Sequence, residues 1–150
     1  MSILNSSALW ALLGLLLIHI EAYCIYNNVK TSNSKRETTY WLRQQPYNAG
    51  PNYFSRFSYN GLKSGEKACC PYTNFDCVRS GNKDDELYMV TRRTTGIREY
   101  PPAVISFPAG GWIEFGGEDG PETQTINVFS PDGSPYDYKF RIDPQAGYTK

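Results

Sequence analysis

The chain has 150 residues and carries 15 basic and 15 acidic side chains, so its formal net charge at pH 7 is zero. Nucleic-acid-binding proteins usually carry a basic excess, so we expect no nucleic-acid partner. The length fits one domain, and the chain is rich in aromatic residues, with 12 tyrosines and 7 phenylalanines.

The N-terminal segment has the organisation of a secretory signal peptide. Residues 8–18 form an uninterrupted apolar run, which is shorter than the roughly 20 residues that span a membrane. Ile20 and Ala22 suit the −3 and −1 positions of a cleavage site. We therefore predict a signal peptide over 1–22, a secreted, extracellular domain over 23–150, and no membrane span.

Cleavage after Ala22 would remove the only histidine, His19. Glu21 is the only charged side chain lost, so the mature chain would keep 15 basic and 14 acidic side chains. Without imidazole the mature protein cannot use a Ser-His-Asp or Cys-His mechanism, nor a nuclease reaction that needs histidine.

Short runs of β-branched and aromatic residues, separated by Gly, Pro, Asn and Asp, predict strands along the mature chain. In chain order the predicted strands cover 24–30, 38–43, 53–59, 66–70, 87–92, 103–107, 111–115, 124–129 and 136–142. Asn60-Gly61 is among the turn signals between them.

Alternation of apolar and polar residues is clearest in two of these runs. Trp112 and Glu114 alternate with Ile113 and Phe115. In 136–142, charged residues alternate with a set predicted to share one half-buried face, namely Tyr136, Tyr138, Phe140 and Ile142.

Many short strands and no helical apolar stripe indicate an all-β protein. We predict a single-domain antiparallel β-sandwich, jelly-roll or Ig-like, with a barrel as the alternative.

The four cysteines, Cys24, Cys69, Cys70 and Cys77, predict two disulfides in a secreted chain. Neighbouring α-carbons lie about 3.8 Å apart, too close for an unstrained bridge, which excludes Cys69 with Cys70. If 66–70 is extended, these two side chains point to opposite faces. We favour Cys70–Cys77 and Cys24–Cys69, and the swapped pairing stays open. The cysteine spacing matches no zinc site, so we expect no metal site there.

Acidic residues supply two further hypotheses. A carboxylate pair from the set Glu99, Glu114, Glu118 and Asp119 could support glycoside hydrolysis. The acidic segments 84–86 and 116–122 could hold calcium, but neither has a recognised ligand spacing, so ordinary polar turns are favoured and no cofactor is expected.

Aromatic residues next to Pro, Gly or Asn, in or near predicted loops, are the candidates for ligand contact, because they combine apolar area with a polar tip. The candidate binding residues are Tyr47, Tyr53, Tyr72, Tyr100 and Trp112, and Tyr148 has a similar setting. For each of them a packing or turn role is the competing interpretation.

Two blocks of sequence carry a resemblance. They are Gly65-Glu66-Lys67-Ala68-Cys69-Cys70-Pro71-Tyr72-Thr73-Asn74-Phe75-Asp76-Cys77 and Pro108-Ala109-Gly110-Gly111-Trp112. With these blocks the chain resembles small secreted cysteine-containing β-rich proteins of fungi. The resemblance implies a secreted β-rich fold and carries no activity or site residues.

The leading functional hypothesis is a non-enzymatic interaction protein that binds a cell-wall glycan or an extracellular protein through loop aromatics. The opposing hypothesis is a small histidine-free glycoside hydrolase with a carboxylate pair.

Overall fold

The computed structural model describes residues 22–31, 36–45, 52, 55–119 and 123–146. The predicted signal peptide lies outside these residues except for Ala22, and so do Tyr47, Tyr53 and Tyr148. No helix within the described ranges has the length and apolar character needed to cross a bilayer.

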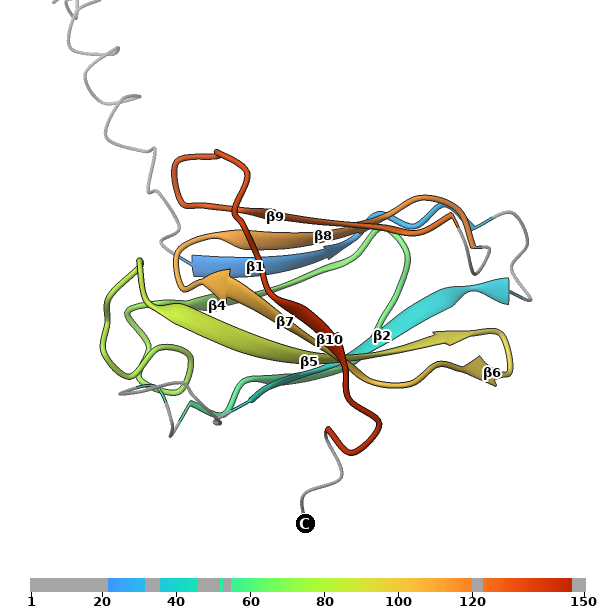
Figure 1. Ribbon diagram of the computed structural model, residues 1–150, viewed down its shortest axis with the longest axis horizontal. Coiled ribbons are helices and arrows are strands. Elements are labelled where there is room, and N and C mark those ends of the chain that lie inside the picture. Colours follow the sequence, from blue (N-terminus) through green and yellow to red (C-terminus); the bar gives the residue numbers. More distant parts are fainter. Residues whose placement is uncertain (1–21, 32–35, 46–51, 53–54, 120–122, 147–150) are drawn as a thin grey trace, which may run out of the picture.

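Two β-sheets pack face to face (Figure 1). The small sheet has the strand order β4-β1-β8-β9, with β4 Lys67–Pro71, β1 Ala22–Asn27, β8 Trp112–Gly116 and β9 Thr125–Phe129. The large sheet has the order β10-β7-β5-β2-β3, with β10 Phe140–Ile142, β7 Ala103–Pro108, β5 Glu86–Thr95, β2 Thr38–Gln44 and β3 Ser58–Leu62. A short strand, β6 Arg98–Glu99, pairs with β5.

The all-β, two-sheet prediction is confirmed, with one difference in strand direction. β1 and β8 run parallel, with Cys24 opposite Trp112 and Asn27 opposite Phe115, whereas the other described strand pairs are antiparallel. The first strand of the domain therefore lies in the middle of the small sheet, between β4 and β8.

The core forms from alternate residues of both sheets, as the period of two in a strand requires. Ile113 and Phe115 are buried while Trp112 and Glu114 lie on the opposite face, as predicted. The largest fully buried side chains are Tyr23, Phe107, Phe115, Ile25, Leu42, Leu62, Leu87, Met89, Ile105 and Ile113.

Asn27 is a fully buried polar residue that joins the two sheets. Its Nδ2 donates to the carbonyl oxygens of Thr38 and Leu62, both at 2.9 Å. Its Oδ1 accepts from the Val29 amide at 3.3 Å. These bonds connect β1 of the small sheet to β2 and β3 of the large sheet.

The third predicted strand was placed wrongly. The expected 53–59 shares only its end with β3, and the Asn60-Gly61 pair expected in a turn lies inside this strand. Between the pairs Tyr40–Leu62 and Leu42–Tyr59 the register shifts by one residue. Gly61 has a φ of 71°, the left-handed conformation of a glycine β-bulge, so here the glycine bends a strand instead of ending it.

The last predicted strand was partly wrong. Tyr136 and Tyr138 pack against the core, but Phe140 and Ile142 are 49% and 63% exposed. The Tyr136 amide donates to the Val128 carbonyl of β9, and the chain then crosses to pair with β7 as β10. The four aromatic and aliphatic residues do not share one face because the chain changes sheets between them.

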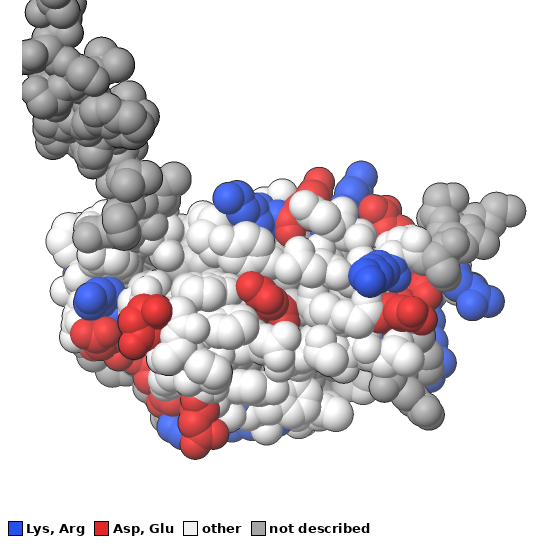
Figure 2. All heavy atoms as spheres, turned by 90° about the horizontal axis from the view of Figure 1, so that it is seen from above, with Lys and Arg blue, Asp and Glu red and all other residues white. Residues whose placement is uncertain are grey.

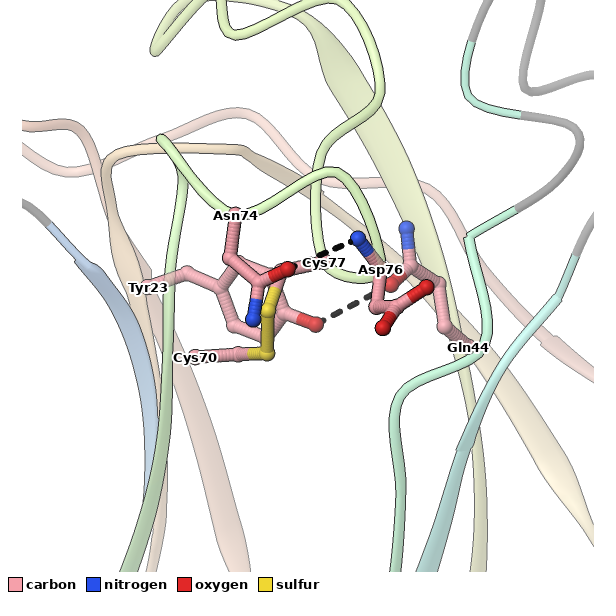
Figure 3. Close-up of a disulfide and its surroundings, with 6 residues drawn as sticks. All are labelled: Tyr23, Gln44, Cys70, Asn74, Asp76 and Cys77. Carbon is pink, nitrogen blue, oxygen red and sulfur yellow. Dashed lines mark hydrogen bonds between the residues drawn. A yellow bond between two sulfur atoms is a disulfide. The ribbon is translucent and has the colours of Figure 1, made fainter.

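Both disulfides have the favoured connectivity, Cys24–Cys69 and Cys70–Cys77. Cys24 and Cys69 are cross-strand partners of β1 and β4. Cys70 packs against the core and bonds to Cys77, which is fully buried, near the Tyr23 ring (Figure 3). The Tyr23 hydroxyl donates to the Gln44 Oε1 at 3.0 Å, which places a buried phenol between the two sheets.

Candidate functional site

The outer face of the small sheet gathers three aromatic side chains from three adjacent strands. These residues alternate with the buried positions of their strands, so they point away from the core. We call this surface the aromatic face and define it by Tyr26 of β1, Trp112 and Glu114 of β8, and Asn127 and Phe129 of β9. Cross-strand register places Trp112 opposite Phe129, and Glu114 opposite both Tyr26 and Asn127.

Trp112 and Phe129 form a stacked pair on the aromatic face. Their rings stack with centroids 4.9 Å apart and planes inclined by 21°. The Trp112 indole nitrogen donates to the Glu114 Oε1 at 2.9 Å. This bond restrains the indole and leaves the other carboxylate oxygen outside it, so the face combines two half-buried aromatic rings with a hydrogen-bond acceptor.

The opposite side of the aromatic face is held by β1 and β4. The Lys67 ammonium lies 5.9 Å from the centroid of the Tyr26 ring. The Cys24–Cys69 disulfide joins the same two strands, and Cys24 lies opposite Trp112 in the register. The bridge therefore restrains the strand next to the indole.

Figure 2 looks onto this side of the sandwich. The surface is uncharged over most of its area, and charged side chains gather mainly along its margin. A mostly uncharged face with a few polar groups fits an uncharged ligand better than a polyanion.

The predicted loop aromatics are not brought together. Tyr72 packs against the core. Tyr100 lies close to two guanidinium groups, with the Cζ atoms of Arg93 and Arg98 at 3.4 and 4.9 Å from its ring centroid. Trp112 lies on a strand, as predicted, and belongs to the outer face of the small sheet. Tyr47 and Tyr53 lie outside the described residues.

The candidate catalytic carboxylates are also dispersed. Glu99 lies on β6 of the large sheet, whereas Glu114 lies on the small sheet. Glu114 lies on β8, whereas Glu118 follows the end of that strand after Gly117, whose φ of 89° interrupts the extended backbone. Asp119 directly follows Glu118.

The first acidic segment is used in the protein's own hydrogen bonds. The Asp85 carboxylate accepts from the side-chain amides of Asn52 and Asn82, at 2.8 and 2.9 Å. Within the described ranges no three acidic, cysteine or histidine side chains group as a metal site. Residues 120–122 of the second segment lie outside those ranges.

Glu86 of the same segment lies in a cluster with three other side chains, those of Tyr88, Tyr136 and Lys139. Tyr88 donates to its Oε2 at 2.6 Å and Lys139 at 2.9 Å. Burial acts to raise the pKa of the Glu86 carboxyl, but these hydrogen bonds outweigh it and hold the pKa below its ordinary value. Glu86 is therefore ionised at neutral pH and ties β5 to the segment before β10.

Tyr26 and Phe129 were not anticipated as site residues. A signal for both was present in the sequence, since each occupies an outward position of a predicted alternating strand. Both residues were missed because the prediction placed exposed aromatic side chains in loops.

Comparison with known proteins yields no relative: no protein-family model, no curated protein and no solved structure matches this chain.

Proposed function

We propose that the protein is an extracellular, non-enzymatic binding protein whose aromatic face holds an uncharged cell-wall glycan. The observation that carries the proposal is the stacked pair Trp112 and Phe129 beside the Glu114 carboxylate. Planar aromatic rings offer apolar area to the flat side of a sugar ring, and a carboxylate accepts hydrogen bonds from sugar hydroxyls.

Two further features support the extracellular part of the proposal. Four cysteines form two disulfides, and such bonds persist in oxidising compartments. The apolar run 8–18 followed by Ile20 and Ala22 is typical of a cleaved leader.

Binding to insoluble polysaccharides tests this function directly. Secreted protein is co-sedimented with β-1,3-glucan, cellulose and chitin, and Trp112→Ala should lower the affinity for the bound polymer at least about tenfold. Glu114→Gln keeps an acceptor for the indole and should weaken binding less than Trp112→Ala does. This milder variant keeps the test valid if Trp112→Ala impairs folding.

Phe75→Ala is the matched control, because Phe75 is a 70% exposed aromatic in the Cys70–Cys77 loop and is not one of the residues that define the aromatic face. It should bind like the wild type. Equal losses for Phe75→Ala and Trp112→Ala, or no polymer bound by the wild type, would contradict the proposal. Release of reducing sugar that Glu114→Gln abolishes would favour the hydrolase instead.

One observation favours a protein partner as a second candidate. Phe75 projects from a loop that the Cys70–Cys77 bridge closes and that Asn74 orders, by accepting from the Asp76 amide at 2.9 Å (Figure 3). An exposed aromatic on a preordered loop is the kind of anchor found at protein interfaces. If a protein partner is identified, Phe75→Ala should weaken that complex while Trp112→Ala leaves it unchanged.

A further inference from the structure

A groove of about 440 Å³ opens beside the aromatic face. Its walls come from three segments that are distant in the sequence: the loop before β5, the end of β7 and the turn after β9. The residues that matter for its chemistry are Lys83, Asp84, Pro108, Ser130, Pro131 and Asp132.

The groove adjoins the stacked pair directly. Ser130 follows Phe129 in the chain, and a β-carbon built on Gly133 would lie 3.7 Å from the Cη2 atom of Trp112. The turn that forms one wall thus rests against the edge of the indole. A chain-like ligand that lies across the Trp112–Phe129 pair can therefore continue into the groove.

Hydrogen bonds between the loop before β5 and the end of β7 hold two of the groove walls together. The Gly110 amide donates to the Lys83 carbonyl at 2.6 Å, and the Ala109 amide donates to the Asp85 carbonyl at 2.9 Å. A β-carbon on Gly110 would lie 2.8 Å from the Lys83 Cβ and 3.1 Å from the Pro131 Cγ. Glycine is required here because the two walls approach each other so closely over this residue.

The turn after β9 is ordered in the same way. The Asp132 Oδ1 accepts from the amide and the hydroxyl of Ser134, at 2.9 and 2.7 Å. These bonds lower the pKa of the Asp132 carboxyl, so it is an ionised acceptor at neutral pH. Its other oxygen has no hydrogen bond from these two Ser134 groups.

The chemistry of the walls matches a polyhydroxylated, uncharged ligand. Lys83 offers hydrogen-bond donors, Asp84 and Asp132 offer acceptors, and the rings of Pro108 and Pro131 offer apolar surface. One ammonium against two carboxylates leaves an acidic excess, which disfavours polyanionic chains.

We propose that this groove is a second subsite for the same uncharged glycan, so that the protein binds several consecutive sugars of one chain. The inference rests on the proposed function, because the first sugars occupy the aromatic face. Longer glycan chains should therefore bind more tightly, and Lys83 and Asp84 should supply this gain in affinity.

The test compares oligosaccharides of increasing length by calorimetry, from dimer to hexamer, in β-1,3-glucose, β-1,4-glucose and β-1,4-N-acetylglucosamine series. For the series that binds, the wild type should bind the hexamer at least about tenfold more tightly than the dimer. The Lys83→Ala/Asp84→Ala variant should lose most of that gain and keep the dimer affinity. A matched control, Lys63→Ala/Asp76→Ala, changes an exposed lysine and an exposed aspartate outside the groove and should behave as the wild type.

A second variant protects the test from a local folding defect. Asp132→Asn retains an acceptor for Ser134 and should also flatten the length dependence. If both groove variants keep the full gain of the hexamer over the dimer, the subsite is overturned while binding at the aromatic face stands. If no series binds the wild type at any length, the proposed function fails, and the subsite fails with it.

Discussion

At the scale of single residues, buried polar groups carry much of the specificity of this fold. Asn27 is fully buried and makes three hydrogen bonds, two of which join the sheets through the Thr38 and Leu62 carbonyls. A buried carbonyl that loses its donor keeps its desolvation cost without compensation, so the contribution of this side chain is greater than that of an exposed amide.

Asn27→Ala should lower the free energy of unfolding by about 3 kcal/mol, because it leaves the Thr38 and Leu62 carbonyls without this donor. Asn28→Ala, at the exposed neighbouring position, should change it by no more than about 0.5 kcal/mol. Urea denaturation of the two variants measures the difference. Similar values would show that Asn27 does not join the sheets.

Two buried tyrosines make stability sensitive to alkaline pH. Burial raises the pKa of the Tyr23 phenol. It also raises the pKa of the Tyr40 phenol, where it outweighs the lowering effect of the positive charge of Arg93. The fold thus favours the neutral phenols. Their contribution to stability is complete below the unfolded-state pKa of about 10 and is lost as the pH rises above it.

Each of these tyrosines should steepen the loss of stability above about pH 10 by about 1.4 kcal/mol per pH unit. Tyr40→Phe should remove one such contribution, so its unfolding free energy should fall less steeply with pH than that of the wild type. Urea denaturation across this pH range measures the slopes. Identical slopes would mean that Tyr40 ionises without unfolding.

Among the secondary-structure elements, a strand was predicted correctly where its local sequence determines it, and was misplaced where contacts with distant segments determine it. β8 was predictable because Ile113 and Phe115 alternate with Trp112 and Glu114 and face the core. β3 was not, since the bulge at Gly61 depends on pairing with β2, which is distant in the sequence. A turn and a glycine bulge use the same residue type, so composition alone does not separate them.

The candidate site shows the same limit. Trp112 could be selected as an exposed aromatic, but its stacking with Phe129 depends on the β8–β9 register. The groove depends on three separate segments meeting at Gly110 and the turn after β9, and no local pattern predicts such a meeting.

The two disulfides differ in accessibility, which follows from the faces of β4. Cys69 is exposed on the outer face, whereas Cys77, the partner of Cys70, is fully buried. Brief mild reduction followed by alkylation should therefore label Cys24 and Cys69 before Cys70 and Cys77. Peptide mass mapping reads the order, and earlier labelling of Cys70 and Cys77 would contradict this arrangement of the strand.

At the scale of the whole molecule, the proposed export has its own test. Protein collected from the medium of expressing cells should begin at Tyr23, and its intact mass should be four hydrogens below that of the reduced chain from Tyr23 to Lys150. A product that retains residues 1–22, or one whose cysteines alkylate before any reductant is added, would contradict the extracellular assignment.

The sandwich presents one mostly uncharged face, and we propose that the glycan binds to this face. After cleavage, Trp41 and Trp112 would be the remaining tryptophans, and Trp41 packs in a separate cluster with Val90 and Val104. In a Trp41→Phe protein, Trp112 is therefore the sole indole reporter.

The most direct measurement is the emission of Trp112 in this single-tryptophan protein, titrated with the oligosaccharide that binds in calorimetry. We expect the emission to shift to shorter wavelength, with its midpoint at the calorimetric dissociation constant, because the sugar displaces water from the indole. Unchanged emission at saturating ligand would place the glycan elsewhere on the protein and contradict the claim.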